Sequence, residues 1–121
     1  MSLTSSVPVL RVSNYARARA FWEGVLGFDV VDEAGDPVVG FGIYRRDRAQ
    51  VFLTAWDGPE ASYDGWRAYF HTDDLNALIS RLDDAGQAYH GPEDTVYGMR
   101  EVSVVDPDGN RVCFGEDLGD G

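Results

Sequence analysis

One pattern occurs twice in this sequence, and it restricts the possible folds more than any other feature. In the first half, a β-branched segment, residues 7–12, is followed by Ser13 or Asn14, either of which can cap a helix with its side-chain oxygen. Apolar residues then recur at the spacing of one helix face until Gly27, a residue type that commonly ends helices. The residues of this face are Ala18, Phe21, Trp22, Val25 and Leu26. The pattern predicts a strand and an amphipathic helix, with Trp22 in the core.

The second half repeats this arrangement. Residues 66–71 predict a strand, Asp73 or Asp74 can cap the helix that follows, and Gly86 can end it. The apolar face of this helix consists of Leu75, Leu78, Ile79 and Leu82. The distance from cap to glycine is the same in both halves, which indicates an internal repeat.

Three further strands are predicted after each helix. The expected ranges are 28–31, 39–44 and 50–55 in the first half, and 88–90, 99–105 and 111–116 in the second. The chain is therefore predicted to have an α+β fold of two βαβββ units, residues 7–56 and 66–116, joined by the polar segment 57–65. Because each unit is too short to fold by itself, residues 1–121 are predicted to form a single domain.

The composition excludes several classes of function. The 121 residues carry a formal net charge of −11, which opposes binding to nucleic acids and to anionic membranes. All ten basic residues are arginine, which excludes Schiff-base and P-loop lysines, and the single Cys113 excludes an intramolecular disulfide. No apolar run approaches the roughly 20 residues that span a bilayer, and the first residues lack a secretory signal. We therefore expect a cytoplasmic protein.

The sequence resembles the vicinal oxygen chelate superfamily in its tandem βαβββ units and in three motifs, Phe21-Trp22, Leu26-Gly27-Phe28 and Asp106-Pro107-Asp108-Gly109-Asn110. This superfamily contains glyoxalase I, extradiol dioxygenases, fosfomycin-resistance enzymes and bleomycin-resistance proteins. The resemblance implies that each half curls a mixed sheet into a cup, with the helices outside and a ligand cleft on the concave face.

The resemblance also permits a test for a metal site. The ligands in the superfamily's metalloenzymes are His, Glu or Gln at four positions, which match Val7, Phe52, Arg67 and Cys113 here. The first three side chains cannot bind a cation, and a lone thiolate cannot hold a divalent ion against water. We therefore expect no metal and no other cofactor.

Within the superfamily, the sequence is most similar to the bleomycin-resistance proteins, small acidic dimers that sequester a cationic glycopeptide without modifying it. The matching segments are residues 3–10, 20–22 and 97–101, where Tyr97 replaces a tryptophan. The resemblance implies an antibiotic-resistance function, namely non-catalytic binding of a cationic aromatic antibiotic such as a bleomycin-type glycopeptide. It also implies a homodimer, for which the N-terminal arm with Leu3, Val7 and Pro8 is a candidate for exchange between subunits.

Strand alternation indicates which side chains line the cup. If Phe52 faces it, so do Gln50 and Thr54, and if Arg67 faces it, so do Tyr69 and His71. We expect the aromatic residues to offer stacking surfaces to a flat ligand. We also expect two groups of acidic residues to attract a cation. The first group is Asp32, Glu33 and Asp36, and the second is Asp57, Glu60 and Asp64. The predicted ligand-binding residues are Phe41, Phe52, Trp56, Arg67, Tyr69, His71, Tyr97, Cys113, Asp32 and Asp36.

Two other interpretations remain open. One is a glyoxalase-like or thiol-transferase-like enzyme of the same superfamily with a degenerate metal site, in which Cys113 is the nucleophile and His71 the base. The other is a structural dimer without a ligand, in which the aromatic rings fill the cup or the dimer interface.

Overall fold

The computed structural model describes residues 1–55 and 65–119, and the predicted site residue Trp56 and the acidic group Asp57, Glu60 and Asp64 lie outside these ranges. The first unit consists of β1 (Val9–Val12), α1 (Tyr15–Arg19), the π-helical segment η1 (Ala20–Val25), β2 (Asp29–Ala34), β3 (Phe41–Arg46) and β4 (Ala49–Ala55). The second consists of β5 (Trp66–His71), α2 (Leu75–Asp84), β6 (His90–Asp94), β7 (Met99–Val105) and β8 (Arg111–Asp117).

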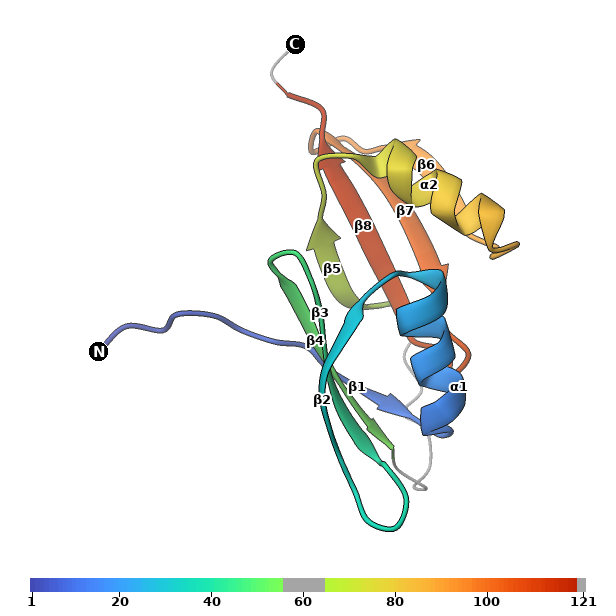
Figure 1. Ribbon diagram of the computed structural model, residues 1–121. Helices are drawn as coiled ribbons and strands as arrows, with labels where there is room; N and C mark the ends of the chain where they lie inside the picture. Colours follow the sequence, from blue (N-terminus) through green and yellow to red (C-terminus); the bar gives the residue numbers. More distant parts are fainter. Residues whose placement is uncertain (56–64, 120–121) are drawn as a thin grey trace.

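The two units form two four-stranded sheets with the same topology. The strand orders are β1-β4-β3-β2 and β5-β8-β7-β6, with β1 parallel to β4, β5 parallel to β8 and the other neighbours antiparallel. The predicted repeat and the α+β fold class are confirmed. Both helices lie on the same side of the sheets, so each sheet has one face without a helix (Figure 1).

The helix ends follow from local chemistry. Asn14, rather than Ser13, caps the first helix by accepting a hydrogen bond from the N–H of Arg17, and Asp74, rather than Asp73, caps α2 by accepting from Ala77. Gly27 and Gly86 follow the helices with φ angles of 77° and 67°, the left-handed conformation that favours glycine. The predicted boundaries of both helices are therefore correct.

The first helix differs from the prediction in its second half. In η1 the turn is wider, and the N–H of Leu26 donates to the carbonyl of Phe21 at 3.0 Å, five residues back. Phe21 and Trp22 are both buried in this segment. A spacing of apolar residues at three and four positions fits a regular α-helix, so the sequence pattern did not predict the wider turn.

The hydrophobic core contains side chains from both units. Trp22 is fully buried, as predicted, and its ring lies edge-on to Phe28 at 5.1 Å and to Phe70 of the second unit at 6.4 Å between centroids. None of the helices in the described residues is long and apolar enough to cross a membrane.

The turn between β7 and β8 connects the two units through polar contacts. Asp106 is buried and accepts hydrogen bonds from the backbone and side-chain amides of Asn110, while burial raises the pKa of its carboxyl group. The Asn110 side chain also donates to the carbonyl of Arg11 at 2.8 Å, and Asp108 accepts from the backbone and hydroxyl of Ser13. The motif at 106–110 therefore holds the second unit against the β1–α1 junction of the first.

Candidate functional site

The second sheet has its helix-free face on the side of Tyr69. Residues directly opposite each other on neighbouring strands share a face, and Tyr69 pairs with Cys113 while Glu101 pairs with Gly115. The residues between these positions along the strands, such as Val102, have their side chains in the hydrophobic core on the helix side. Tyr69, His71, Cys113 and Glu101 therefore lie on one face, as the alternation predicted for the first three.

The first sheet has an apolar helix-free face. Phe52 is paired with Val9 on β1 and with Ile43 on β3, and its ring lies 5.5 Å from that of Phe41 in an edge-on arrangement. Val51, the next residue on β4, is fully buried on the opposite face. The predicted alternation along this strand is correct.

Three rings form a row along β5. The ring centroids of Trp66 and Tyr69 are 5.2 Å apart, and those of Tyr69 and His71 are 5.1 Å apart. Regular alternation would place Trp66 on the opposite face, but the strand register shifts between Trp66 and Ala68. The bulge at Arg67 therefore brings Trp66, which is not among the predicted site residues, to the Tyr69 side.

A carboxylate joins two of the tyrosines on this face. The phenols of Tyr69 and Tyr97 both donate to Oε2 of Glu101, at 2.9 Å and 2.5 Å, and Glu101 is only 8% exposed. Tyr69 reaches Glu101 across Gly115, where an added Cβ would lie 1.8 Å from the phenol oxygen. Glu101 is not among the residues predicted from the sequence, although Glu101 and Ser103 alternate with core valines along β7, and this pattern could have indicated the face.

The surroundings of this face keep the Cys113 thiol and the Tyr69 phenol protonated. Burial, with a smaller contribution from the charge of Glu101, raises the pKa of the Cys113 thiol to about 12. Burial and the hydrogen bond to Glu101 also raise the pKa of Tyr69. At neutral pH Cys113 is therefore a thiol, which is a weak nucleophile and a weak metal ligand.

The positions that match the superfamily's metal ligands do not fit a cation. Of the four matched positions, Phe52 lies on β4 beside Val9 and Cys113 lies on β8 beside Tyr69, while Val7 precedes β1 and Arg67 is at the bulge of β5. An aromatic ring, a neutral thiol, an aliphatic side chain and a guanidinium do not form a set of metal ligands. Within residues 1–55 and 65–119, no three His, Cys, Asp or Glu side chains gather in a possible metal site.

The predicted acidic residues of the first unit lie far from Tyr97. The β2–β3 loop with Asp36 and the β6–β7 turn with Tyr97 are at opposite ends of the molecule (Figure 1). Asp32 accepts a hydrogen bond from the backbone of Glu33, whose own carboxylate pairs with Arg19 at 2.6 Å. One chain therefore does not bring Asp32, Asp36 and Tyr97 together.

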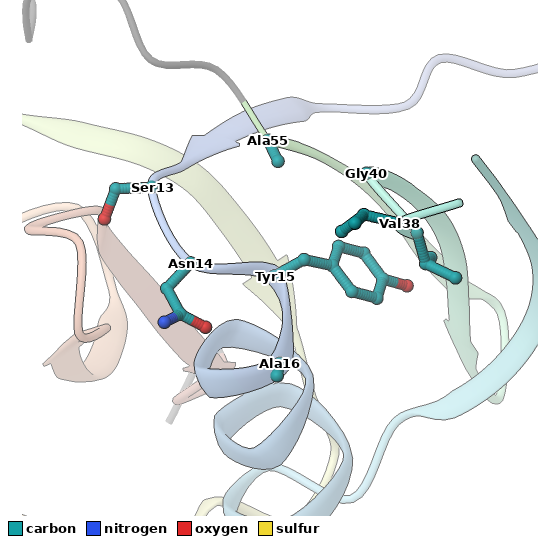
Figure 2. Close-up of a pocket in the computed structure, with 8 residues that line it drawn as sticks. Ser13, Asn14, Tyr15, Ala16, Val38, Gly40 and Ala55 are labelled. Atoms are coloured by element: carbon teal, nitrogen blue, oxygen red, sulfur yellow. The ribbon is translucent and has the colours of Figure 1, made fainter. Parts of the chain in front are cut away.

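Two cavities lie beside the sheets. A groove of about 1240 Å³ between the units is lined by Tyr69 and His71 of β5, the β3–β4 turn and the N-terminal arm. A smaller pocket of about 720 Å³ adjoins α1, and Figure 2 shows the Tyr15 ring directed toward Val38. None of the predicted site residues lines this second pocket, and the side chain of Asn14 there already caps the helix. The groove is therefore the cavity that adjoins the candidate site.

The family comparison agrees with this architecture. The model of the Glyoxalase/Bleomycin resistance protein/Dioxygenase superfamily matches residues 5–114. The chain belongs to this superfamily. No curated protein matches the sequence.

Solved structures of other proteins show the same fold. TnmS3, an antibiotic binding protein from Streptomyces sp. CB03234, is 26% identical with a TM-score of 0.75, and the match covers 97% of this chain and 99% of that one. A bleomycin-binding protein complexed with bleomycin is 23% identical with a TM-score of 0.80, covering 95% and 99%. A lactoylglutathione lyase from Agrobacterium tumefaciens is 19% identical with a TM-score of 0.73, covering 96% and 95%.

Proposed function

We propose that this chain is a cytoplasmic, non-catalytic binding protein that sequesters a cationic aromatic compound, such as a bleomycin-type glycopeptide antibiotic. The observation that carries the proposal is the helix-free face of the second sheet, where exposed rings lie beside a buried carboxylate. Trp66 is 44% exposed and Tyr97 is 59% exposed, so both offer stacking surface to a flat ligand. The proposed ligand-binding residues are Trp66 together with Phe41, Phe52, Arg67, Tyr69, His71, Tyr97, Cys113, Asp32 and Asp36.

Several observations favour binding over catalysis. The neutral Cys113 thiol and the unsuitable donors at the metal-matching positions disfavour a glyoxalase-like or thiol-transferase-like enzyme. The net charge of −11 attracts cations over a long range. TnmS3, at 26% identity, is an antibiotic binding protein.

We also propose that the binding unit is a homodimer. Asp32 and Phe41 lie in the first sheet and Asp36 in its β2–β3 loop, whereas Tyr97 lies in the β6–β7 turn of the second sheet, so a second copy would have to bring the two sets together. Leu3 and Val9 are largely exposed, and the N-terminal arm extends away from the fold (Figure 1). Light scattering is expected to give the mass of two chains at micromolar concentration, and deletion of residues 1–6 should weaken association if the arm is exchanged.

Titration calorimetry tests the binding function directly. Bleomycin and a set of flat cationic dyes are titrated into the protein at low and at high salt. We expect micromolar or tighter binding of at least one compound, weakened by salt because of the acidic surface. Absence of binding below the millimolar range for all of them would exclude sequestration, and turnover of a thiol-conjugated substrate would replace it with the enzyme interpretation.

A further inference from the structure

Glu101 is a buried carboxylate without a positively charged partner in the described part of the chain. Its side chain is in the second sheet, where only 8% of the residue is exposed. None of the ion pairs formed within residues 1–55 and 65–119 includes it. Buried carboxylates in proteins are normally paired with a cation or fully hydrogen-bonded, because removing a charge from water is costly.

The two oxygens of this carboxylate have different surroundings. Both phenols, Tyr69 and Tyr97, donate to Oε2. Oε1 receives no hydrogen bond from the described residues, and it is not among the side-chain atoms that are sealed from solvent without a partner. One oxygen is therefore held by the protein, while the other is open to a donor that comes from outside.

The surroundings of Oε1 favour a positively charged donor. Glu93 on β6 lies directly opposite Glu101, which adds a second carboxylate beside it. The negative charge of Glu101 contributes to the raised pKa of Tyr69, of Tyr97 and of the Cys113 thiol, so a positive charge at this point would be favoured. The half-exposed ring of Tyr97 adjoins the same carboxylate and can also attract a cation.

We propose that Oε1 of Glu101 binds the protonated amino or amidino group of a flat aromatic ligand whose ring stacks on Tyr97. This inference rests on the proposed binding function and adds to it the atom that selects a cation over a neutral compound of the same shape. A hydrogen bond from a charged donor to a carboxylate is stronger than one between neutral groups, and it is strengthened further where water is partly excluded.

The test compares two flat tricyclic dyes, cationic proflavine and neutral acridone, on the full chain. Glu101→Gln keeps the size of the side chain and an acceptor for both phenols, but it removes the charge. We expect it to weaken proflavine binding by about ten- to hundredfold, since hydrogen bonds to charged groups are worth more than neutral ones. Acridone binding should stay unchanged. Glu23→Gln, which removes the same charge from the helix side, is the matched control and should alter neither affinity.

A second variant separates ligand recognition from support of the tyrosines. Tyr97→Phe retains the stacking ring and frees Oε2 of one donor, so the carboxylate becomes a better acceptor. Proflavine binding should then tighten by about two- to tenfold, the worth of one ordinary hydrogen bond. If Glu101 does not contact the ligand and only holds the two tyrosines in place, this variant should weaken the binding of both dyes.

The outcomes distinguish this inference from the proposed function. Binding of both dyes to the wild-type protein, with no loss of proflavine affinity in Glu101→Gln, would overturn the role of Glu101 and leave the binding function intact. Failure of the wild-type protein to bind either dye or bleomycin would overturn both. If Glu101→Gln does not fold, as judged by circular dichroism, Tyr97→Phe decides, because weaker proflavine binding in that variant contradicts the proposal.

Discussion

The two sheets have the same strand order, with a parallel pair at one edge and antiparallel strands beside it, yet their helix-free faces carry different chemistry. On the first sheet, Phe41 and Phe52 form an aromatic pair. On the second, Tyr69 and Tyr97 donate hydrogen bonds to the buried Glu101. The repeated fold therefore provides two equivalent surfaces, one apolar and suited to an interface, the other polar and suited to selecting a ligand.

A pair of glycines shows the same contrast in detail. At Gly42 on β3 an added Cβ would lie 2.1 Å from the phenol oxygen of Tyr15, and at Gly115 on β8 it would lie 1.8 Å from that of Tyr69. Tyr15 accepts a hydrogen bond from the hydroxyl of the buried Tyr44 on the core side, whereas Tyr69 donates to Glu101 on the open face. In both sheets a missing side chain makes room for a tyrosine, but one tyrosine fills the core and the other completes the candidate site.

The largest effect is expected from a charge on the apolar face. Phe52→Asp would place a carboxylate without a partner on the apolar helix-free face of the first sheet, which we expect the second copy to cover in the dimer. This should weaken association by at least about 3 kcal/mol, more than a hundredfold. Analytical ultracentrifugation over a concentration series measures this. Asn76→Asp, at an exposed position of α2 on the helix side, adds the same charge and should leave association unchanged. A wild-type dissociation constant in Phe52→Asp would mean that this face is not in an interface.

The next effect concerns the glycine under the core tyrosines. Gly42→Ala should destabilise the fold by about 1–3 kcal/mol, because Tyr15 and Tyr44 are buried and cannot move away from the added methyl group. Urea denaturation measures the change. Gly24→Ala is the control, since an added Cβ there meets nothing within 4 Å and the helix should gain about 0.5–1 kcal/mol. Equal stability of Gly42→Ala and the wild type would show that the two rings can rearrange.

Gly115→Ala should destabilise the fold less than Gly42→Ala, but it should change ligand binding. Tyr69 lies at the surface of the open face, so its ring can swing outward and limit the loss of stability to about 1 kcal/mol or less. The same movement breaks its hydrogen bond to Glu101 and frees Oε2 of one donor, as Tyr97→Phe does. Proflavine binding should therefore tighten by about two- to tenfold, while Gly42→Ala leaves the binding of the folded protein unaltered. Calorimetry on both variants tests this, and a Gly115→Ala protein with wild-type binding would show that the position of Tyr69 does not matter to the ligand.

Much of the fold could be predicted because it depends on local patterns. The capping residues, the glycines after the helices and the spacing of apolar residues predict both helices. The turn residues at 106–110 predict the last hairpin. The wider turn in η1 and the bulge at Arg67 could not be predicted, because each depends on packing between distant segments. One bulge is enough to bring Trp66 to the face that alternation assigns to its neighbours.

The candidate site was predicted less completely than the fold. Alternation along single strands placed Phe52, Tyr69 and His71 correctly, since it needs no knowledge of other strands. The role of Glu101 depends on Tyr69 crossing Gly115 from another strand, and that contact exists only in the folded sheet. The wide separation of Asp36 from Tyr97 likewise follows from the arrangement of the two units rather than from either sequence segment.

The smallest effect, on tyrosine ionisation, separates the two faces most directly. The pKa of Tyr97 is raised chiefly by its hydrogen bond to Glu101, whereas burial is the main cause for Tyr15 and Tyr44. Glu101→Gln should therefore lower the pKa of Tyr97 toward its ordinary value of about 10 and leave the two core tyrosines raised. Ultraviolet difference titration with single Tyr→Phe variants for assignment measures this, and Tyr89, whose pKa is raised by Asp83, is the internal control.

The same shifts fix the sign of the stability change with pH. A phenol whose folded pKa exceeds its unfolded value contributes stability that is fully present below about pH 10 and is lost as the pH rises through the folded pKa. The wild-type protein should therefore lose stability above about pH 10, and Glu101→Gln should lose less of it, because the contributions of Tyr69, Tyr97 and, to a smaller extent, the Cys113 thiol depend on this carboxylate. An alkaline stability curve of Glu101→Gln that parallels the wild type would show that burial alone controls both phenols, and the polar face of the second sheet would then differ from the apolar face of the first in composition but not in electrostatics.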